Sequence, residues 1–236
     1  MTDPMRLVVL SAGLSTPSST RMLADQLSAS VRRELERFGT EVDVTTVELR
    51  EYAHDITDTM LTRFPGERLA MVVESLRAAD AVIAVTPVFN VGPSGLFKSF
   101  FDAVDIEIWK HKPVLLGATA GTPRHSLAID YAIRPMFGYL KAELVPTSVF
   151  AASGDFGADD SGQGEQDPLG ARAARAAAEL VTMLRAGVSE AAQAIETAAQ
   201  EGADGASAQD GPGSGGSGRD AEFSDFVPMG KLLGRG

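Results

Sequence analysis

Apolar residues recur along this chain in two patterns, short unbroken runs and longer segments spaced three or four residues apart. Short apolar runs are typical of strands buried in a parallel sheet, whereas the longer spacing places side chains on one face of a helix. The runs predict five strands, at residues 6–10, 42–49, 81–85, 113–118 and 144–151. The helical spacing predicts helices at residues 19–38, 67–79, 93–105, 124–142 and from 168 to about 200.

Strict alternation of strands and helices predicts an α/β fold in three layers, a doubly wound parallel sheet between two layers of helices. Five strands of this kind fit the flavodoxin-like order 2-1-3-4-5. Residues 52–64 are expected to form a loop with one helical turn. Pro93 is expected in the first turn of its helix, and Pro135 is expected to bend the following helix without ending it.

The last part of the chain differs in composition from the rest. Residues 201–220 are rich in Gly, Ala, Ser and acidic residues, which predicts a flexible linker. Residues 221–236 form an apolar tail, which either docks on a protein surface or stays unstructured. The expected organisation is therefore one domain over residues 1–200, then the linker and the tail.

Composition excludes several classes of function. The formal net charge of −11 disfavours binding to the phosphate backbone of a nucleic acid. No apolar run approaches the roughly 20 residues that span a bilayer, and residues 1–4 do not begin a secretory signal, so we expect neither a membrane protein nor a secreted one. The lack of cysteine excludes disulfides, thiolate metal sites and cysteine nucleophiles, and fits a reducing cytoplasm.

Loops rich in small and polar residues follow three of the predicted strands, at the strand ends where open α/β sheets bind ligands. The loop at residues 11–20 precedes a helix and suits a phosphate dianion, because helix N-termini and hydroxyls bind anions. Arg21 adds a possible positive charge there. The alternative is that a serine of this loop merely caps the helix. The candidate phosphate-binding hydroxyls are Ser11, Ser15, Ser18, Ser19 and Thr20.

The other two loops suit a flat ring, which needs an apolar surface and main-chain hydrogen bonds at its polar edge. The alternative for the second loop is a simple turn chosen for backbone geometry. Arg124 and His125 are candidates for contact with the ring edge or with a substrate that stacks on the ring, or else are plain surface residues. The candidate ring-binding residues are Pro87, Val88, Phe89, Asn90, Thr119, Ala120, Gly121 and Thr122.

The order and spacing of three segments, SAGLSTPSSTRMLADQL, TPVFNVGPSGLFKSFFDAVD and GATAGTPRHSLAIDYAIRPMF, resemble the NADPH-dependent FMN reductase family. The resemblance covers residues 5–153 and is strongest to an actinobacterial branch that supplies reduced flavin to luciferase-like monooxygenases. Two departures are Phe89, where many relatives have Tyr, and Pro17, where many have Arg or Lys. The family pattern that holds the flavin ring falls on Pro87, Phe89, Asn90, Gly95, Leu96 and Lys98.

The resemblance implies an NAD(P)H:FMN oxidoreductase with FMN and NADPH (or NADH) as cofactors and a homodimer or homotetramer as assembly. It also implies transfer of a hydride from nicotinamide to flavin N5, which needs no catalytic side chain because the cofactors carry the chemistry. The sequence accordingly shows no nucleophile and no metal triad. The apolar helix at 93–105 either forms an interface or belongs to the core.

Two alternatives use the same scaffold. One is reduction of quinones or azo dyes, and the other is a non-enzymatic electron carrier like flavodoxin. A carrier normally seals its ring between aromatic side chains, but the only tryptophan, Trp109, lies outside the three loops and only Phe89 is placed to stack. An enzyme whose ring face stays open to NAD(P)H and to an acceptor, such as a flavin-dependent monooxygenase partner, is therefore favoured.

Overall fold

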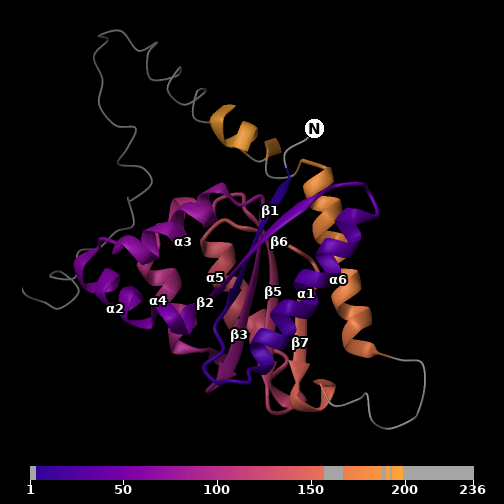
Figure 1. Ribbon diagram of the computed structural model, residues 1–236, viewed down its shortest axis with the longest axis horizontal. Coiled ribbons are helices and arrows are strands. Elements are labelled where there is room, and N and C mark those ends of the chain that lie inside the picture. Colours follow the sequence, from indigo (N-terminus) through magenta and orange to yellow (C-terminus); the bar gives the residue numbers. More distant parts are fainter. Residues whose placement is uncertain (1–3, 157–166, 188–189, 192, 199–236) are drawn as a thin grey trace, which may run out of the picture. The chain divides into compact units, whose positions relative to one another are not determined.

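The computed structural model describes residues 4–156, 167–187, 190–191 and 193–198. A central, mostly parallel sheet runs in the order β2-β1-β3-β5-β6, with β7 also paired to β5 and the short β4 antiparallel to β3 (Figure 1). The strands are β1 (Met5–Ser11), β2 (Val42–Glu48), β3 (Ala81–Phe89), β4 (Gly92–Pro93), β5 (Pro113–Ala120), β6 (Glu143–Leu144) and β7 (Val149–Ala152).

Helices cover both faces of this sheet. Helices α1 (Ser19–Glu36) and α6 (Pro168–Arg185) lie side by side on one face, and the other helices cover the opposite face (Figure 1). The latter are α2 (Ala53–Thr62), α3 (Glu67–Ala78), α4 (Gly95–Ala103) and α5 (Arg134–Tyr139). Single turns of other helix types are η1 (Leu49–Tyr52), η2 (Ile106–Ile108), η3 (Pro123–His125), η4 (Ile129–Ile133, a π-helix) and η5 (Ser153–Phe156).

The predicted α/β fold and strand order are confirmed, but the strand count is wrong. The predicted strand at 144–151 is divided into β6 and β7, which pair with different parts of β5. Pro146 lies between them, and a proline has no N–H to donate to a sheet ladder. The second difference is β4, which turns the end of β3 into a hairpin.

Several helix predictions need correction. Within residues 52–64, where a loop was expected, the chain forms α2 (Ala53–Thr62); only Ile56 and Thr59 of that helix are buried, so few of its residues are needed in the core. Pro93 belongs to β4, and α4 begins two residues later, where the Ser94 side chain accepts a hydrogen bond from the Phe97 amide. The predicted helix at 124–142 is divided into η3, η4 and α5.

Pro135 lies in the first turn of α5, directly after the π-helical turn η4, and residues 128–139 stay helical without a break. The helix therefore continues through Pro135, as expected, and changes from π to α geometry just before it; the bend itself stays a prediction. Helix α6 ends at Arg185, short of the predicted limit near residue 200, and helical turns recur at 190–191 and 193–198. The predicted linker at 201–220 and tail at 221–236 lie outside the described residues.

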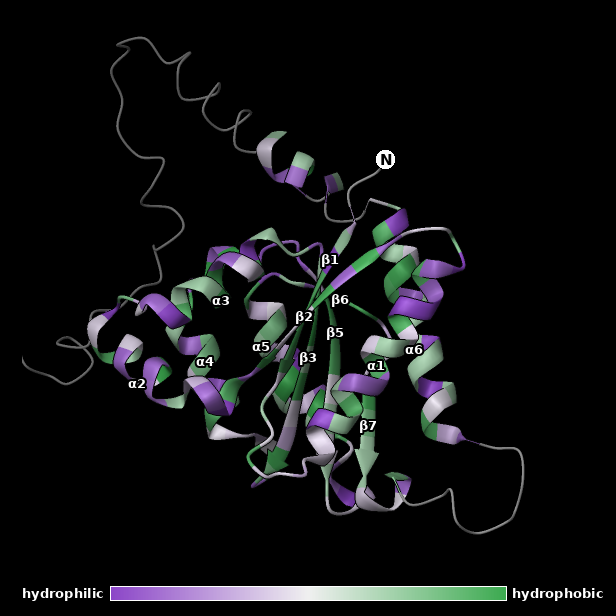
Figure 2. Cartoon of the chain, in the orientation of Figure 1, coloured by the Kyte–Doolittle hydropathy of each residue, from purple (hydrophilic) through white to green (hydrophobic). Residues whose placement is uncertain are grey.

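The side chains of each central strand alternate between two apolar cores. Val8 and Leu10 of β1 face the core beneath α2 to α5, whereas Leu7 and Val9 face the core beneath α1 and α6. Figure 2 shows hydrophobic residues concentrated along the central strands, while the helices carry both hydrophobic and hydrophilic residues. Burial on both faces explains why these strands read as continuous apolar runs in the sequence.

An aromatic cluster anchors α4 to the larger core. Its ring centroids lie close together, for example 4.6 Å between Phe101 and Trp109 and 4.9 Å between Phe101 and Phe137. Phe97 and Phe100 are fully buried in the same cluster. The apolar face of α4 is thus part of the core, which settles the choice between core and interface for this helix.

Within the described part of the chain, no helix combines the length and apolarity that crossing a membrane requires.

We predict that Phe100→Ala lowers the free energy of unfolding by about 3–5 kcal/mol, because a fully buried aromatic ring is removed and leaves a cavity. Chemical denaturation followed by far-UV circular dichroism measures this change. Phe64→Ala is the matched control, since that ring is 79% exposed. An equal decrease in the free energy of unfolding in both variants would show that the buried aromatic cluster contributes no more to stability than an exposed ring.

Candidate functional site

The three polar loops emerge at one rim of the sheet. β1, β3 and β5 are adjacent and parallel, with Ser11 beside Val85 and Val85 beside Gly117 in the register. The Ala12 amide donates to the Val85 carbonyl at 2.9 Å, which carries the pairing into the start of the first loop. The carboxyl ends of these strands, and the loops that follow them, therefore lie next to one another.

The first loop folds tightly against the start of α1. The Ser18 side chain accepts a hydrogen bond from the Arg21 amide at 3.3 Å, and the Ser15 hydroxyl donates to the Pro17 carbonyl at 2.9 Å. Gly13 permits this packing, because a Cβ at that position would lie only 2.0 Å from Ser18 Oγ. Ser18 thus caps the helix, as the alternative reading of this loop proposed.

This cap leaves donors for an anion. The amides of Ser19 and Thr20 donate to no acceptor in the described part of the chain, as expected for the first turn of a helix. Ser19 is exposed, and the positive end of the α1 dipole lies here. At the end of β1, the buried Ser11 Oγ has no hydrogen-bond partner among the described residues. These groups fit a phosphate dianion.

A buried hydrogen bond joins the first loop to the third. Thr20 Oγ1 and Thr119 Oγ1 lie 2.8 Å apart, and each residue is 2% exposed. The two hydroxyls therefore hold the start of α1 against the end of β5 and do not face solvent. Of the other predicted residues in the third loop, Ala120 is half-buried, whereas Gly121 and Thr122 are exposed.

The second loop is a tight hairpin between β3 and β4. Phe89 pairs with Gly92, and the two residues between them have left-handed φ angles of 51° for Asn90 and 66° for Val91. A two-residue turn with both φ positive is typical of hairpins, but a β-branched residue there is strained. Strained backbone is concentrated at functional sites. The second loop is therefore a tight β-hairpin turn whose backbone is strained at Val91.

Apolar side chains from all three loops are left exposed. Pro87 is half-buried and Val88 is buried, but Phe89 is 47% exposed and Asn90 is also exposed. The other exposed apolar residues on or beside these loops are Leu14, Val91 and Leu127. Exposed apolar side chains together with a helix terminus that offers free amides are the chemistry that a flat ring carrying a phosphate requires.

The candidate substrate-binding residues Arg124 and His125 lie in η3, which follows the third loop directly, and both are exposed. Lys98, from the family pattern, makes an ion pair with Asp102 one turn further along α4, with 2.7 Å between Nζ and Oδ2. Gly95 is exposed and Leu96 half-buried in the first turn of that helix.

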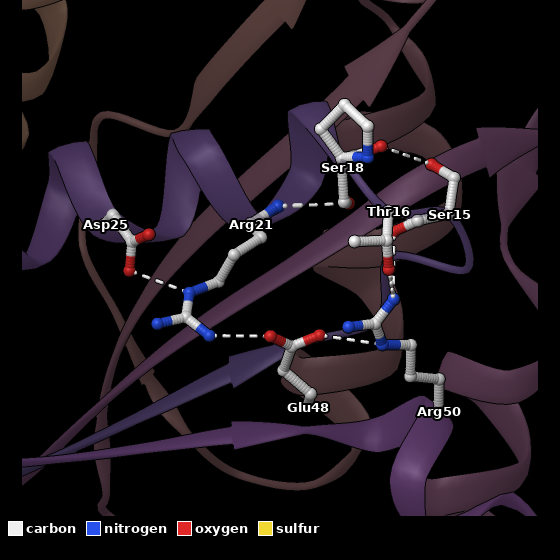
Figure 3. A network of polar contacts seen from close by, with 8 residues as sticks. Ser15, Thr16, Ser18, Arg21, Asp25, Glu48 and Arg50 are labelled. Carbon is white, nitrogen blue, oxygen red and sulfur yellow. Dashed lines mark hydrogen bonds and ion pairs between the residues drawn. The ribbon is translucent and has the colours of Figure 1, made fainter.

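A network of ion pairs at the first loop includes two residues that the sequence did not single out, Glu48 and Arg50 (Figure 3). Arg50 donates through Nη1 to the Ser15 carbonyl at 3.0 Å and to the Thr16 hydroxyl. No local pattern reveals these contacts, since 35 residues separate Arg50 from Ser15. They arise because β2 lies beside β1.

Arg21 does not direct its charge at the loop. Its Nε donates to Asp25 at 2.8 Å and its Nη1 to Glu48 at 2.6 Å. The hydrogen bond with Asp25 raises the pKa of Arg21, so this guanidinium remains charged and paired. The expected positive charge of Arg21 at the first loop is therefore neutralised by two carboxylates.

We predict that Gly13→Ala weakens FMN binding at least about tenfold, because the new methyl group displaces Ser18 and the loop amides lose their alignment. Fluorescence quenching of the flavin on titration with protein measures the dissociation constant. Gly138→Ala is the control, since a Cβ there meets nothing within 4 Å. Equal affinity in the two variants would mean that the loop shape does not matter for binding.

Comparison with known proteins agrees with this geometry. The chain is 34% identical over 190 residues to an FMN reductase (NADPH) from Pseudomonas aeruginosa, covering 80% of this chain and 97% of that one. It is 30% identical over 156 residues to the NADH-dependent FMN reductase SfnF of Pseudomonas fluorescens, covering 66% and 81%.

Solved structures agree as well. An oxidoreductase from Corynebacterium diphtheriae superposes with a TM-score of 0.71 at 42% identity and covers 78% of this chain and 98% of its own. The apo form of an NADH:FMN oxidoreductase, EmoB, shares the fold, with a TM-score of 0.64, 24% identity and coverage of 75% and 88%. The model of the NADPH-dependent FMN reductase family matches residues 5–157. With its three loops at one rim of a flavodoxin-like sheet, this chain belongs to the NADPH-dependent FMN reductase family.

Proposed function

We propose that this protein reduces FMN with NAD(P)H at the rim formed by the three loops, and that the flavin lies there with one ring face open. The observation that carries the proposal is the adjacency of two complementary surfaces. The first turn of α1 offers amides for a phosphate, and the neighbouring loops offer exposed apolar side chains for a ring.

The first loop would hold the phosphate. The amides of Ser19 and Thr20 supply donors, and the same loop carries the short hydroxyl side chains of Ser11, Ser15 and Ser18. The helix dipole adds to the attraction, which matters in a protein of net charge −11. Thr20 acts through its bond to Thr119, which keeps the phosphate end and the ring end of the site in fixed relation.

The second and third loops would orient the ring. Residues 87–90 offer an apolar surface at Phe89 and a polar amide side chain at Asn90, and residues 119–122 add main-chain groups on the adjacent strand end. When bound, FMN supplies the hydride acceptor at N5, so the protein needs no acid, base or nucleophile of its own. Its residues bind the flavin and position it.

The nicotinamide substrate would approach over the exposed apolar face. Arg124 and His125 stand on the third loop as contacts for its charged or polar groups. The curated relatives include enzymes named for NADPH and for NADH, so we propose use of either nucleotide.

The open face also suits delivery of reduced flavin to a partner monooxygenase, and a homodimer or homotetramer is the assembly we propose. Tyr131 in η4 and Tyr139 in α5 are each nearly four-fifths exposed, and we propose their rings as contacts with another subunit or with the monooxygenase. A cytoplasmic location fits the cysteine-free sequence.

Steady-state oxidation of NADPH or NADH with free FMN tests the reaction directly. Purified protein is expected to consume nicotinamide in proportion to enzyme concentration, followed by nicotinamide absorbance. Binding of FMN without turnover would instead identify an electron carrier. Turnover that requires a quinone or an azo dye in place of free flavin would identify a reductase of those acceptors.

We predict that Ser18→Ala and Asn90→Ala each weaken FMN retention about fivefold, since each removes a polar group worth roughly 1 kcal/mol at the rim. Equilibrium dialysis with FMN measures the change. Ser75→Ala is the control, because its hydroxyl donates to the Met71 carbonyl within α3, away from the rim. Unchanged retention in both rim variants would show that the flavin binds elsewhere.

A further inference from the structure

Arg50 contacts the first loop from the neighbouring edge strand, β2. It lies in η1, directly after β2, and its guanidinium contacts two consecutive loop residues, Ser15 and Thr16 (Figure 3). Its side chain is 29% exposed, so the group is neither fully solvated nor buried in the core.

Glu48 fixes the direction of this guanidinium. Glu48 Oε2 accepts from Arg50 Nε at 2.8 Å, while its other oxygen accepts from Arg21 Nη1 at 2.6 Å. The Glu48 side chain is only 16% exposed, which limits how far it can move away. Held at Nε by the carboxylate and at Nη1 by the loop, Arg50 has its planar fork fixed in orientation.

One nitrogen of this fork remains available. Arg50 Nη2 makes no hydrogen bond or ion pair with the residues that the structure describes, and Figure 3 draws it without a dashed line. A guanidinium has five N–H donors, and Nη2 carries two of them. Nη2 belongs to the guanidinium that contacts the first loop. The amides of Ser19 and Thr20, at the end of this loop, also donate to no acceptor among the described residues.

Two other candidate cations of the predicted site, Arg21 and Lys98, are paired with carboxylates. Arg21 is paired with Asp25 and Glu48, as described above. Lys98 is paired with Asp102 in α4. Arg50 is thus the cation, among the described residues, whose guanidinium is bonded to the first loop itself.

We propose that Arg50 binds the phosphate group of the flavin through Nη2, and that Glu48 is the positioning residue that aims it. This inference rests on the proposed function. The chemistry recognised is a phosphate monoester dianion, which FMN carries at its 5′ position and NADPH at its 2′ position. Because Arg50 contacts the loop that leads into α1, we assign it to the FMN phosphate.

The test compares two flavins that differ only in the phosphate. Arg50→Ala is expected to raise the dissociation constant for FMN by about ten- to a hundredfold, as for loss of a charge-assisted hydrogen bond. The dissociation constant for riboflavin, which has no phosphate, is expected to stay unchanged. Salt is expected to weaken FMN binding less in the variant than in the natural protein, because one attractive charge is gone.

Arg37→Ala is the matched control, since that arginine pairs with Glu34 on the exposed face of α1 and is expected to leave both flavins unaffected. If Arg50→Ala does not fold, Arg50→Lys is measured in the same way. A lysine keeps the charge but lacks the planar fork, so FMN affinity is still expected to fall while riboflavin affinity holds.

Three results would overturn the inference. Equal loss for FMN and riboflavin would mean that Arg50 only supports the fold of the loop. An unchanged FMN affinity would remove it from the site. A change confined to the KM for NADPH, with the KM for NADH constant, would assign the residue to the nucleotide phosphate. Failure of the natural protein to bind FMN at all would instead overturn the proposed function.

Discussion

The parallel pairing of β1, β3 and β5 is the constraint on which the site depends. Parallel strands end at the same edge, so three loops that are distant in the sequence meet there. Gly117 of β5 contributes at close range: a Cβ there would lie 3.1 Å from Leu27 Cδ1 and from Val85 Cγ2. Because Gly117 has no Cβ, α1 can pack closely against the sheet, and the first turn of that helix then lies over the rim.

The rim combines rigid supports with unsatisfied groups. The Thr20–Thr119 bond, the Ser18 cap and the bond from the Ser94 amide to Thr86 Oγ1 hold the loops in place. Beside them lie the strained Val91, the exposed ring of Phe89 and the buried Ser11 hydroxyl, which has no partner among the described residues. Backbone strain and a buried polar group without a partner both lower the stability of a protein without a ligand. Their concentration at one edge is what a preorganised binding site requires.

Local sequence patterns predicted most of the fold because both faces of the sheet are buried, so its strands stand out as apolar runs. The patterns failed where tertiary contacts decide the structure. Helix α2 buries few residues, the segment at 124–142 contains a π-helical turn, and the strand expected at 144–151 is interrupted near Pro146. The hairpin after β3 was also missed, since its Asn-Val turn is unusual for a left-handed pair.

The sequence by itself determined the α/β class, the strand order, the three loops and the family, because these follow from apolar periodicity and from motifs a few residues long. Tertiary structure alone decided which polar groups meet. It joined Thr20 to Thr119 across 99 residues, Arg50 to Ser15 across 35 and Glu48 to Arg21 across 27. Such pairs follow from strand adjacency, and neither residue's local sequence carries a physical signal of its distant partner.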